Sequence, residues 1–263
     1  MKSLINLLRY PEINNLDLNN EERLIFHRRI LSQKSLLRKV FNKFHETFNS
    51  CDEFFFSGTG LRIELGSGIA PMQDRYSDVL ATDIVMSTGL DQVLDAHDMN
   101  LKSNSVRALF GQNCFHHFSK PIKFFREAER VLEPGGGIVL IEPYYGLFAE
   151  FLYPKLFNSE GYDKNFLSWE APIDGPMKGA NQALSYIIFK RDSSVFEKKF
   201  PNLQIIHQST CNNYLTYLLS GGLNFRQLVP NSFAPILEGL EWFISPLSRF
   251  LALHHVIVIR KTL

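Results

Sequence analysis

The chain has 263 residues, of which 45% are apolar and 21% charged, and its formal net charge is +1. This composition is typical of a globular protein with one large domain or two small ones, long enough to bury a core. No basic stripe is present, so we expect no nucleic-acid partner. The three cysteines show no metal-ligand spacing, which predicts no metal site and fits the reducing cytoplasm.

Two stretches of the sequence bear on membrane association. The N-terminus lacks the charged and then apolar pattern of a leader, so we expect none. The most apolar late stretch, 243–259, is interrupted by Pro246, Arg249 and two histidines. We therefore expect no membrane span.

Residues 1–52 are predicted to form an N-terminal helical cap. Asn19 or Asn20, followed by two glutamates, indicates a helix start. Farther on, apolar residues recur at helical spacing and form one stripe: Leu37, Val40, Phe41, Phe44 and Phe48. The simpler interpretation is a helix that packs on the main domain, and the alternative is a lid over a bound ligand.

The most informative stretch is 61–71, where a short apolar strand runs into Gly66-Ser67-Gly68. Glycine tolerates positive φ and lets a ligand approach the backbone closely. A strand, a glycine loop and then a helix form the usual ligand site of open α/β sheets. Pro71 stands where a dinucleotide fingerprint has its third glycine. Glu64, just before the loop, suits a ligand with a cationic end.

The run Glu64-Leu65-Gly66-Ser67-Gly68 resembles the first motif of class I S-adenosylmethionine (SAM)-dependent methyltransferases. SAM carries an ammonium and a sulfonium, which explains the carboxylate. The resemblance implies that Glu64 faces the ammonium, and that Gly66, Ser67 and Gly68 hold the methionine end and the ribose. A nicotinamide-dependent oxidoreductase is the competing enzyme class, and Pro71 counts against it.

Two more acids follow predicted strands. Asp83 ends the strand 79–83, where its carboxylate can accept both ribose hydroxyls, and Ile84 beside it joins this candidate site. The alternative for Asp83 is a helix cap or a solvated turn. The resemblance implies that Asp95 and Ala96, at the end of a third strand, meet the adenine.

The fourth predicted strand, 106–111, is followed by the polar residue Gln112 and then by His116 and His117. Such a segment lies at the carboxyl edge of the sheet, facing the ligand crevice. The resemblance implies that the histidines lie near the transferred methyl group, where histidine can act as a general base. The alternative is that neither histidine has a chemical role, with one capping the next helix and the other packed in the protein. Arg107 departs from the family, which has an acid there, and this puts local strand pairing in doubt.

A second motif supports the resemblance. An amphipathic helix over 122–132 ends in Pro134 and three glycines, which stop a helix, and an apolar strand follows over 138–142. This turn is similar to the one that leads into the fifth strand of the same family. The resemblance covers roughly residues 59–143.

Beyond residue 143 the resemblance weakens. The segment 144–202 is rich in aromatic residues and is predicted to be an acceptor-side insertion, with Tyr144, Tyr145 and Trp169 as candidate substrate-binding residues. The alternative is a minor core of its own. The remaining predicted elements are a helix at 181–191, a strand at 203–207, a helix at 235–250 broken at Pro246, and a terminal strand at 254–259.

Together these patterns predict an α/β fold: a Rossmann-like, seven-stranded, mostly parallel sheet with helices on both faces and an antiparallel last strand. The expected units are a cap (1–52), a SAM-binding core (53–143), an insertion (144–202) and a C-terminal part that completes the sheet (203–263). The predicted function is SAM-dependent methyl transfer to a small organic acceptor, which could be linked to a lipid or a sugar. The alternative is a non-catalytic SAM-binding or interaction subunit.

Overall fold

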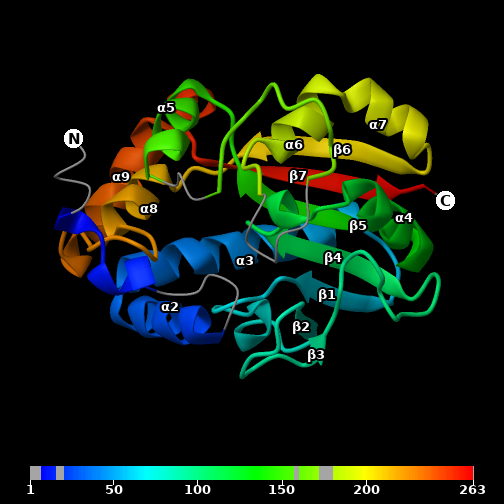
Figure 1. Cartoon of the computed structure of the whole chain (residues 1–263), viewed down its shortest axis with the longest axis horizontal. Helices are drawn as coiled ribbons and strands as arrows, with labels where there is room; N and C mark the ends of the chain where they lie inside the picture. Colours follow the sequence, from blue (N-terminus) through cyan, green and yellow to red (C-terminus); the bar gives the residue numbers. More distant parts are fainter. Residues whose placement is uncertain (1–6, 16–20, 157–159, 172–179, 263) are drawn as a thin grey trace.

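The computed structural model describes residues 7–15, 21–156, 160–171 and 180–262. Its centre is a seven-stranded sheet in the order β3-β2-β1-β4-β5-β7-β6 (Figure 1). Pairing is parallel from β3 to β5, and β7 is antiparallel to both β5 and β6. The strands are β1 (Leu61–Leu65), β2 (Val79–Asp83), β3 (Gln92–Val93), β4 (Val106–Gln112), β5 (Leu132–Pro143), β6 (Leu203–Thr210) and β7 (His254–Lys261).

The predicted fold class is therefore confirmed, and the helices lie around the sheet. The α-helices are α2 (Glu21–Gln33), α3 (Ser35–Phe55), α4 (Pro121–Val131), α5 (Leu147–Leu156), α6 (Leu184–Tyr186), α7 (Ser193–Lys199), α8 (Tyr214–Ser220), α9 (Ala234–Phe243) and α10 (Ser248–Leu251). The short 3-10 and π segments are η1 (Pro11–Asn15), η2 (Met72–Asp74), η3 (Phe115–His117), η4 (Ile187–Arg191), η5 (Asn231–Phe233) and η6 (Ser245–Leu247). Among the described residues no helix is long and apolar enough to cross a membrane.

The long helix α3 covers one face of the sheet. Its predicted apolar stripe is mostly buried, with Val40, Phe44 and Phe48 packed on alternate residues of β4, β5 and β7. Helix α4 packs on the other face, against the intervening residues of the same strands. Strand β5 shows the alternation, because Ile138 and Ile141 belong to opposite cores and both are fully buried. This is why the central strands are apolar at successive positions.

The predicted helix after the glycine loop is wrong. Only the single 3-10 turn η2 follows the loop, and Met72 from that turn is buried in the core that α3 forms. The N-terminal segment thus fills the layer where a βαβ crossover helix would otherwise lie. The predicted start at Asn19 or Asn20 falls outside the described residues, and α2 begins at Glu21.

Three other predictions need correction at the level of single elements. The third strand is only two residues long, because Asp95 accepts the amide of His97 and turns the chain away. The predicted glycine turn at 133–137 is an irregularity inside β5, where strand register jumps between Leu132 and Gly137. The helix predicted at 181–191 consists of the short α6 and a π-helical turn.

Arg107, which departs from the family pattern, lies at a register shift of β4 against both β1 and β5. Its Nε donates to Oδ1 of Asp52 at 2.8 Å, and Arg62 Nε lies 2.8 Å from the other oxygen of the same carboxylate. Asp52 belongs to α3 and is 1% exposed. The departure is therefore explained as an ion-pair network that joins α3 to the sheet.

Candidate functional site

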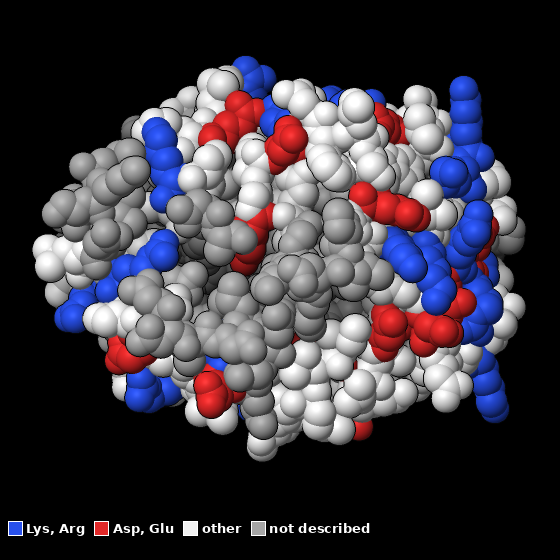
Figure 2. Space-filling model, viewed as in Figure 1, with Lys and Arg blue, Asp and Glu red and all other residues white. Residues whose placement is uncertain are grey.

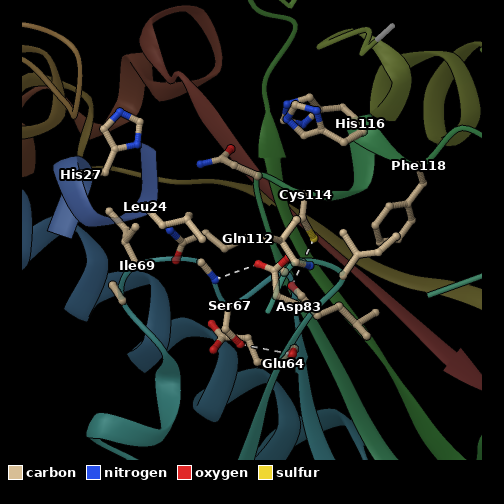
Figure 3. Close-up of a pocket in the computed structure, with 18 of the residues that line it drawn as sticks. Leu24, His27, Glu64, Ser67, Ile69, Asp83, Gln112, Cys114, His116 and Phe118 are labelled. Atoms are coloured by element: carbon tan, nitrogen blue, oxygen red, sulfur yellow. Dashed lines mark hydrogen bonds between the residues drawn. The ribbon is translucent and has the colours of Figure 1, made fainter. Parts of the chain in front are cut away.

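A cavity of about 330 Å³ opens at the carboxyl ends of β1, β2 and β4 (Figure 3). The sheet order places β2 and β4 on opposite sides of β1, so this is the topological switch point at which α/β sheets bind ligands. All of the predicted cofactor residues and both histidines line it: Glu64, Gly66, Ser67, Gly68, Asp83, Ile84, Asp95, Ala96, Gln112, His116 and His117. The sequence pattern thus brings together residues from five separate segments.

The glycine loop needs glycine at two positions for different reasons. Gly66 has φ of 63°, and a Cβ there would lie 2.8 Å from the Cβ of Cys114, so a side chain is excluded by the protein itself. Gly68 has φ of 56°, but its Cβ would meet only the Gly66 carbonyl oxygen, at 3.7 Å. A side chain on Gly68 would extend along the cavity wall, where a ligand would otherwise lie.

Three side chains fasten the loop. Ser67 bonds to β2 through its amide, which donates to the Thr82 carbonyl at 2.9 Å, and its Oγ accepts the Thr82 amide at 3.1 Å. Asp83 accepts the Gly68 amide at 3.1 Å and, through its other oxygen, the Val85 amide at 3.1 Å. Glu64 accepts the amide of Met72, beyond the loop, at 2.8 Å. The predicted ligand residues therefore also hold the loop in shape.

The Glu64 carboxyl is buried at the wall of the cavity, with 2% of the residue exposed. Burial raises its pKa to about 7, against the opposing effect of its hydrogen bonds. A cation placed beside it would favour the ionised form. The group is therefore suited to bind a positively charged ligand with loss of a proton.

On the far side of the cavity lie the residues predicted to meet the adenine. Asp95 Oδ1 accepts hydrogen bonds from both the amide and the Nδ1 of His97, each at 2.8 Å. Ala96 is buried, whereas Ile84 is 51% exposed and offers an apolar surface beside Asp83. This side of the cavity is thus apolar with one fixed carboxylate at its edge.

His116 is held between two carboxylates. Its Nδ1 lies 2.5 Å from Glu142 Oε2, and its Nε2 lies 3.5 Å from Glu160 Oε2. Burial acts to lower the pKa of His116, but the two carboxylates outweigh it and raise that pKa to about 10. At neutral pH His116 is an imidazolium, so it cannot accept a proton from a substrate.

His117, in contrast to His116, is neutral. Its ring lies 4.3 Å from that of His116, centroid to centroid, and burial together with that charge lowers its pKa to about 3. Its Nδ1 has no hydrogen-bond partner among the described residues. Of the two predicted histidines, the neutral His117 is therefore the one that offers a free lone pair to the cavity.

His116, His117 and Glu160 also bring ligating atoms within 4.8 Å of one another, which is close enough for a metal ion. The ion triad of Glu142, His116 and Glu160 accounts for the same geometry. We therefore interpret the cluster as a set of ion pairs centred on His116.

Glu142 is the main site residue that sequence reasoning missed. It is fully buried, and its Oε1 accepts the amides of Cys114 and Phe115 at 3.0 and 2.9 Å. The carboxylate thus fixes the turn that presents both histidines. One signal was available, because Glu142 is a lone acid at the carboxyl end of an apolar strand, as Glu64 and Asp83 are.

Helix α2 forms another wall of the cavity. The sequence predicted a helical cap here, with a lid over a bound ligand as the alternative, but no individual ligand-binding residues. Arg23, Leu24 and His27 line the cavity, and the Arg28 guanidinium donates to the Gly68 carbonyl at 3.1 Å. Burial lowers the pKa of His27 to about 4, so this ring is neutral. The two N-terminal helices have different roles: α3 packs on the sheet, and α2 covers the glycine loop.

The candidate acceptor residues do not line the cavity. Trp169 is in the core beside α4 and α7, and its Nε1 donates to Asp192 at 2.8 Å. Tyr144 and Tyr145 stack on each other and on His255, outside the cavity. The insertion instead contributes Tyr153, Glu160 and Gln182 to the wall. Tyr144, Tyr145 and Trp169 therefore pack against other side chains and do not contact the cavity.

The cavity wall also carries polar atoms that lack partners. Six buried atoms of the lining residues have no hydrogen bond within the described part of the chain: Arg23 Nε, Gln112 Oε1, Asn113 Oδ1, His116 Nε2, His117 Nδ1 and His254 Nδ1. Buried polar atoms are normally satisfied. The wall is therefore complementary to a ligand that has several polar groups, and a SAM-sized molecule fits that description.

The sheet order and the glycine loop are those of a Rossmann-like fold with a cavity at its switch point. Residues 65–140 match the family model described as "Methyltransferase domain", which confirms the resemblance seen in the glycine loop and the turn before β5. No curated protein matches the chain in sequence.

A solved structure shows the same fold over most of the chain. Geranyl diphosphate C-methyltransferase from Streptomyces coelicolor, in complex with Mg²⁺, geranyl diphosphate and S-adenosyl-L-homocysteine, is similar with a TM-score of 0.53 and 10% identity, over 94% of this chain and 86% of that one. Phosphoethanolamine N-methyltransferase 2 from Haemonchus contortus has a TM-score of 0.47 and 13% identity, over 83% of this chain. The chain covers 52% of that protein's length.

Proposed function

We propose that this chain binds SAM in the cavity and transfers its methyl group to a small organic acceptor, free or linked to a lipid or a sugar. The observation that carries the proposal is the convergence of the Glu64–Gly68 loop, Asp83 and Asp95 on one cavity at the switch point. The methyltransferase match over residues 65–140 supports the same conclusion.

Each part of the cofactor has a candidate partner. Glu64 would face the ammonium, and the backbone at Gly66 and Gly68 would lie along the methionine end and the ribose. Asp83 would accept the ribose hydroxyls. Ile84, Asp95 and Ala96 would meet the adenine, with Ser67 and Gln112 completing the wall.

Bound SAM supplies an electrophilic methyl group on a sulfonium. The chain's own contribution is to hold the acceptor in line and to exclude water, and positioning alone is worth roughly 7–11 kcal/mol in favourable cases. His117 is our candidate for the group that takes a proton from a hydroxyl or amine acceptor. His116 is a positioning residue, since its charge, its hydrogen bond to Glu142 and its ion pair with Glu160 fix the ring beside it.

The ribose assignment can be tested by replacing Asp83 with alanine. We expect SAM affinity to fall by about 1.5–3 kcal/mol, because a charge-assisted hydrogen bond is lost. The matched control is Asp91→Ala: Asp91 accepts the Ala81 amide at 2.8 Å but does not line the cavity. Titration calorimetry should separate the two variants, and equal affinities would remove Asp83 from the ribose role.

The Glu64 assignment predicts a pH dependence of binding. Because the pKa of Glu64 is about 7 without ligand, a cation that needs the ionised form should bind about tenfold more weakly for each pH unit below that value. Glu64→Gln should bind weakly and without this dependence. A constant SAM affinity for the unaltered protein between about pH 7 and pH 5.5 would contradict the assignment.

Turnover tests the proposed reaction itself. The protein is incubated with SAM labelled in the methyl group and with cell extract divided into aqueous and lipid-soluble fractions, and label in product and S-adenosylhomocysteine are both measured. We expect protein-dependent label in one fraction, which also identifies the acceptor class. SAM binding without label transfer to any fraction would favour the alternative, a non-catalytic SAM-binding subunit.

We place the reaction in a reducing compartment such as the cytoplasm. This part of the proposal rests on the thiols, since all three cysteines are free. Burial also raises the pKa of Cys211 to about 12, which keeps that thiol unreactive.

A further inference from the structure

The C-terminal helices carry a large exposed apolar surface that the cavity does not use. Helix α9 buries only Ala234, Leu237 and Glu241. Its other side exposes Ile236, Leu240, Trp242 and Phe243, the last two at 78% and 74%. Isolated exposed apolar residues are ordinary, but a continuous set of this kind indicates an interaction surface.

The exposed surface continues through η6 and α10 to α5. Leu247 and Phe250 are 50% and 39% exposed, and Leu147 and Phe151 of α5 are 70% and 53% exposed. A Cβ on Gly146 would lie 2.8 Å from the Arg249 carbonyl oxygen, so the two helices are in contact. Figure 1 shows α5 and α9 at the same end of the molecule, with the red segment after α9 beside α5. We call these eight residues the apolar end.

Two basic side chains, Lys155 and Arg249, lie at the apolar end. Lys155 lies over the ring of Phe151, and the Arg249 guanidinium lies 4.5 Å from the ring centre of Phe250. The acids of α5, α9 and α10 are engaged: Glu150 pairs with Lys164, Glu238 with Lys39, and Glu241 is buried. Elsewhere on the face drawn in Figure 2, Lys and Arg lie among Asp and Glu.

We propose that the apolar end is a membrane-docking surface that inserts into the headgroup region of an anionic bilayer. Tryptophan, phenylalanine and leucine beside lysine and arginine form the pattern of interfacial helices, in which the basic groups reach the lipid phosphates. A second copy of the chain fits less well, because a symmetric contact would bring Lys155 and Arg249 of one copy towards the same side chains of the other.

Docking would also orient the cavity. The inner side of α5 contributes Tyr153 to the cavity wall, while Leu147 and Phe151 on the same helix are exposed at the apolar end. If the proposed methyltransferase activity holds, this arrangement brings the site close to the lipid surface and favours a lipid-linked acceptor. The docking surface itself is independent of SAM and can be tested without it.

The test is flotation of the whole protein with vesicles of equal parts phosphatidylcholine and phosphatidylglycerol, compared with phosphatidylcholine alone. We expect binding to the anionic vesicles. Trp242→Ser and Phe243→Ser should each weaken it about tenfold or more. Lys155→Gln and Arg249→Gln should each weaken it roughly fivefold, and added salt should mimic that loss.

The matched control is Phe54→Ser, since Phe54 is 81% exposed but lies in the last turn of α3. Helix α9 packs on Leu36, in the first turn of that helix, and α3 rises about 1.5 Å per residue, which places Phe54 far from the apolar end. This variant should bind vesicles as the unaltered protein does. Melting curves and SAM binding would show that each variant is folded.

Tryptophan emission gives a second measurement. The chain has 2 tryptophans, and Trp169 is 9% exposed whereas Trp242 is 78% exposed. Emission should shift to shorter wavelength when anionic vesicles are added, and the shift should be absent in Trp242→Ser. No vesicle binding, an unchanged Trp242 emission in bound protein, or a dimer that Trp242→Ser converts to monomer without any vesicle binding would overturn the proposal.

Discussion

Gly68→Val is expected to weaken SAM binding by roughly 100-fold or more, about 2.8 kcal/mol, while the protein stays folded. A Cβ at this position meets only the Gly66 carbonyl oxygen, at 3.7 Å, so the protein does not block it, although the φ of 56° strains any side chain there. It would fill the part of the cavity where the backbone should meet the ligand. Calorimetry with SAM gives the affinity, and a melting curve gives the stability.

The control for this variant is Gly89→Val. Gly89 has φ of 87°, nothing lies within 4 Å of its Cβ, and it is outside the cavity. Valine at either glycine carries a similar backbone cost, about 1–2 kcal/mol for a left-handed residue. Loss of SAM binding in both variants would mean that strain, and not the ligand site, explains the effect at Gly68.

Glu142→Ala is expected to destabilise the fold by about 3–5 kcal/mol, because removal of one partner leaves the buried His116 imidazolium poorly compensated. The backbone amides of Cys114 and Phe115 would lose their acceptor as well. For a chain of this size the melting temperature should fall by roughly 6–20 °C. Denaturant unfolding would give the free energy.

Two comparisons make the Glu142 experiment specific. Glu46→Ala removes an exposed carboxylate that pairs with Arg75 at 2.7 Å, and it should cost less than about 1 kcal/mol. Glu142→Gln keeps one acceptor oxygen and should fall between the two. A Glu142→Ala protein as stable as Glu46→Ala would show that the triad does not hold the histidine turn in place.

The sheet was predictable from the sequence because its strands carry local signals. Ile138 to Ile141 form an apolar run typical of a strand buried on both faces, although β5 begins at Leu132 and includes the glycines before the run. The helix expected after Gly68 failed for a physical reason that no local pattern reveals. The stripe of α3, far upstream, already fills the layer beside β1, so a crossover helix has no room there.

Part of the candidate site was likewise predictable from local signals in the sequence, and part was not. Glu64, Asp83 and Asp95 could be found because each acid lies at, or just after, the carboxyl end of a strand. The ion pair between His116 and Glu160 could not, since the two residues are far apart in sequence and Glu160 lies in a segment without a motif. Trp169 was assigned to an acceptor pocket on composition, but its packing beside α4 depends on long-range contacts that composition does not encode.

The central claim is that the cavity at the switch point binds SAM, and calorimetric titration of the ligand-free protein with SAM, S-adenosylhomocysteine and NAD tests it most directly. We expect saturable binding of SAM and its demethylated product at one site, no binding of NAD, and loss of both signals in Gly68→Val but not in Gly89→Val. Binding of NAD in place of SAM, or of neither ligand, would contradict the assignment of this loop and of the function built on it.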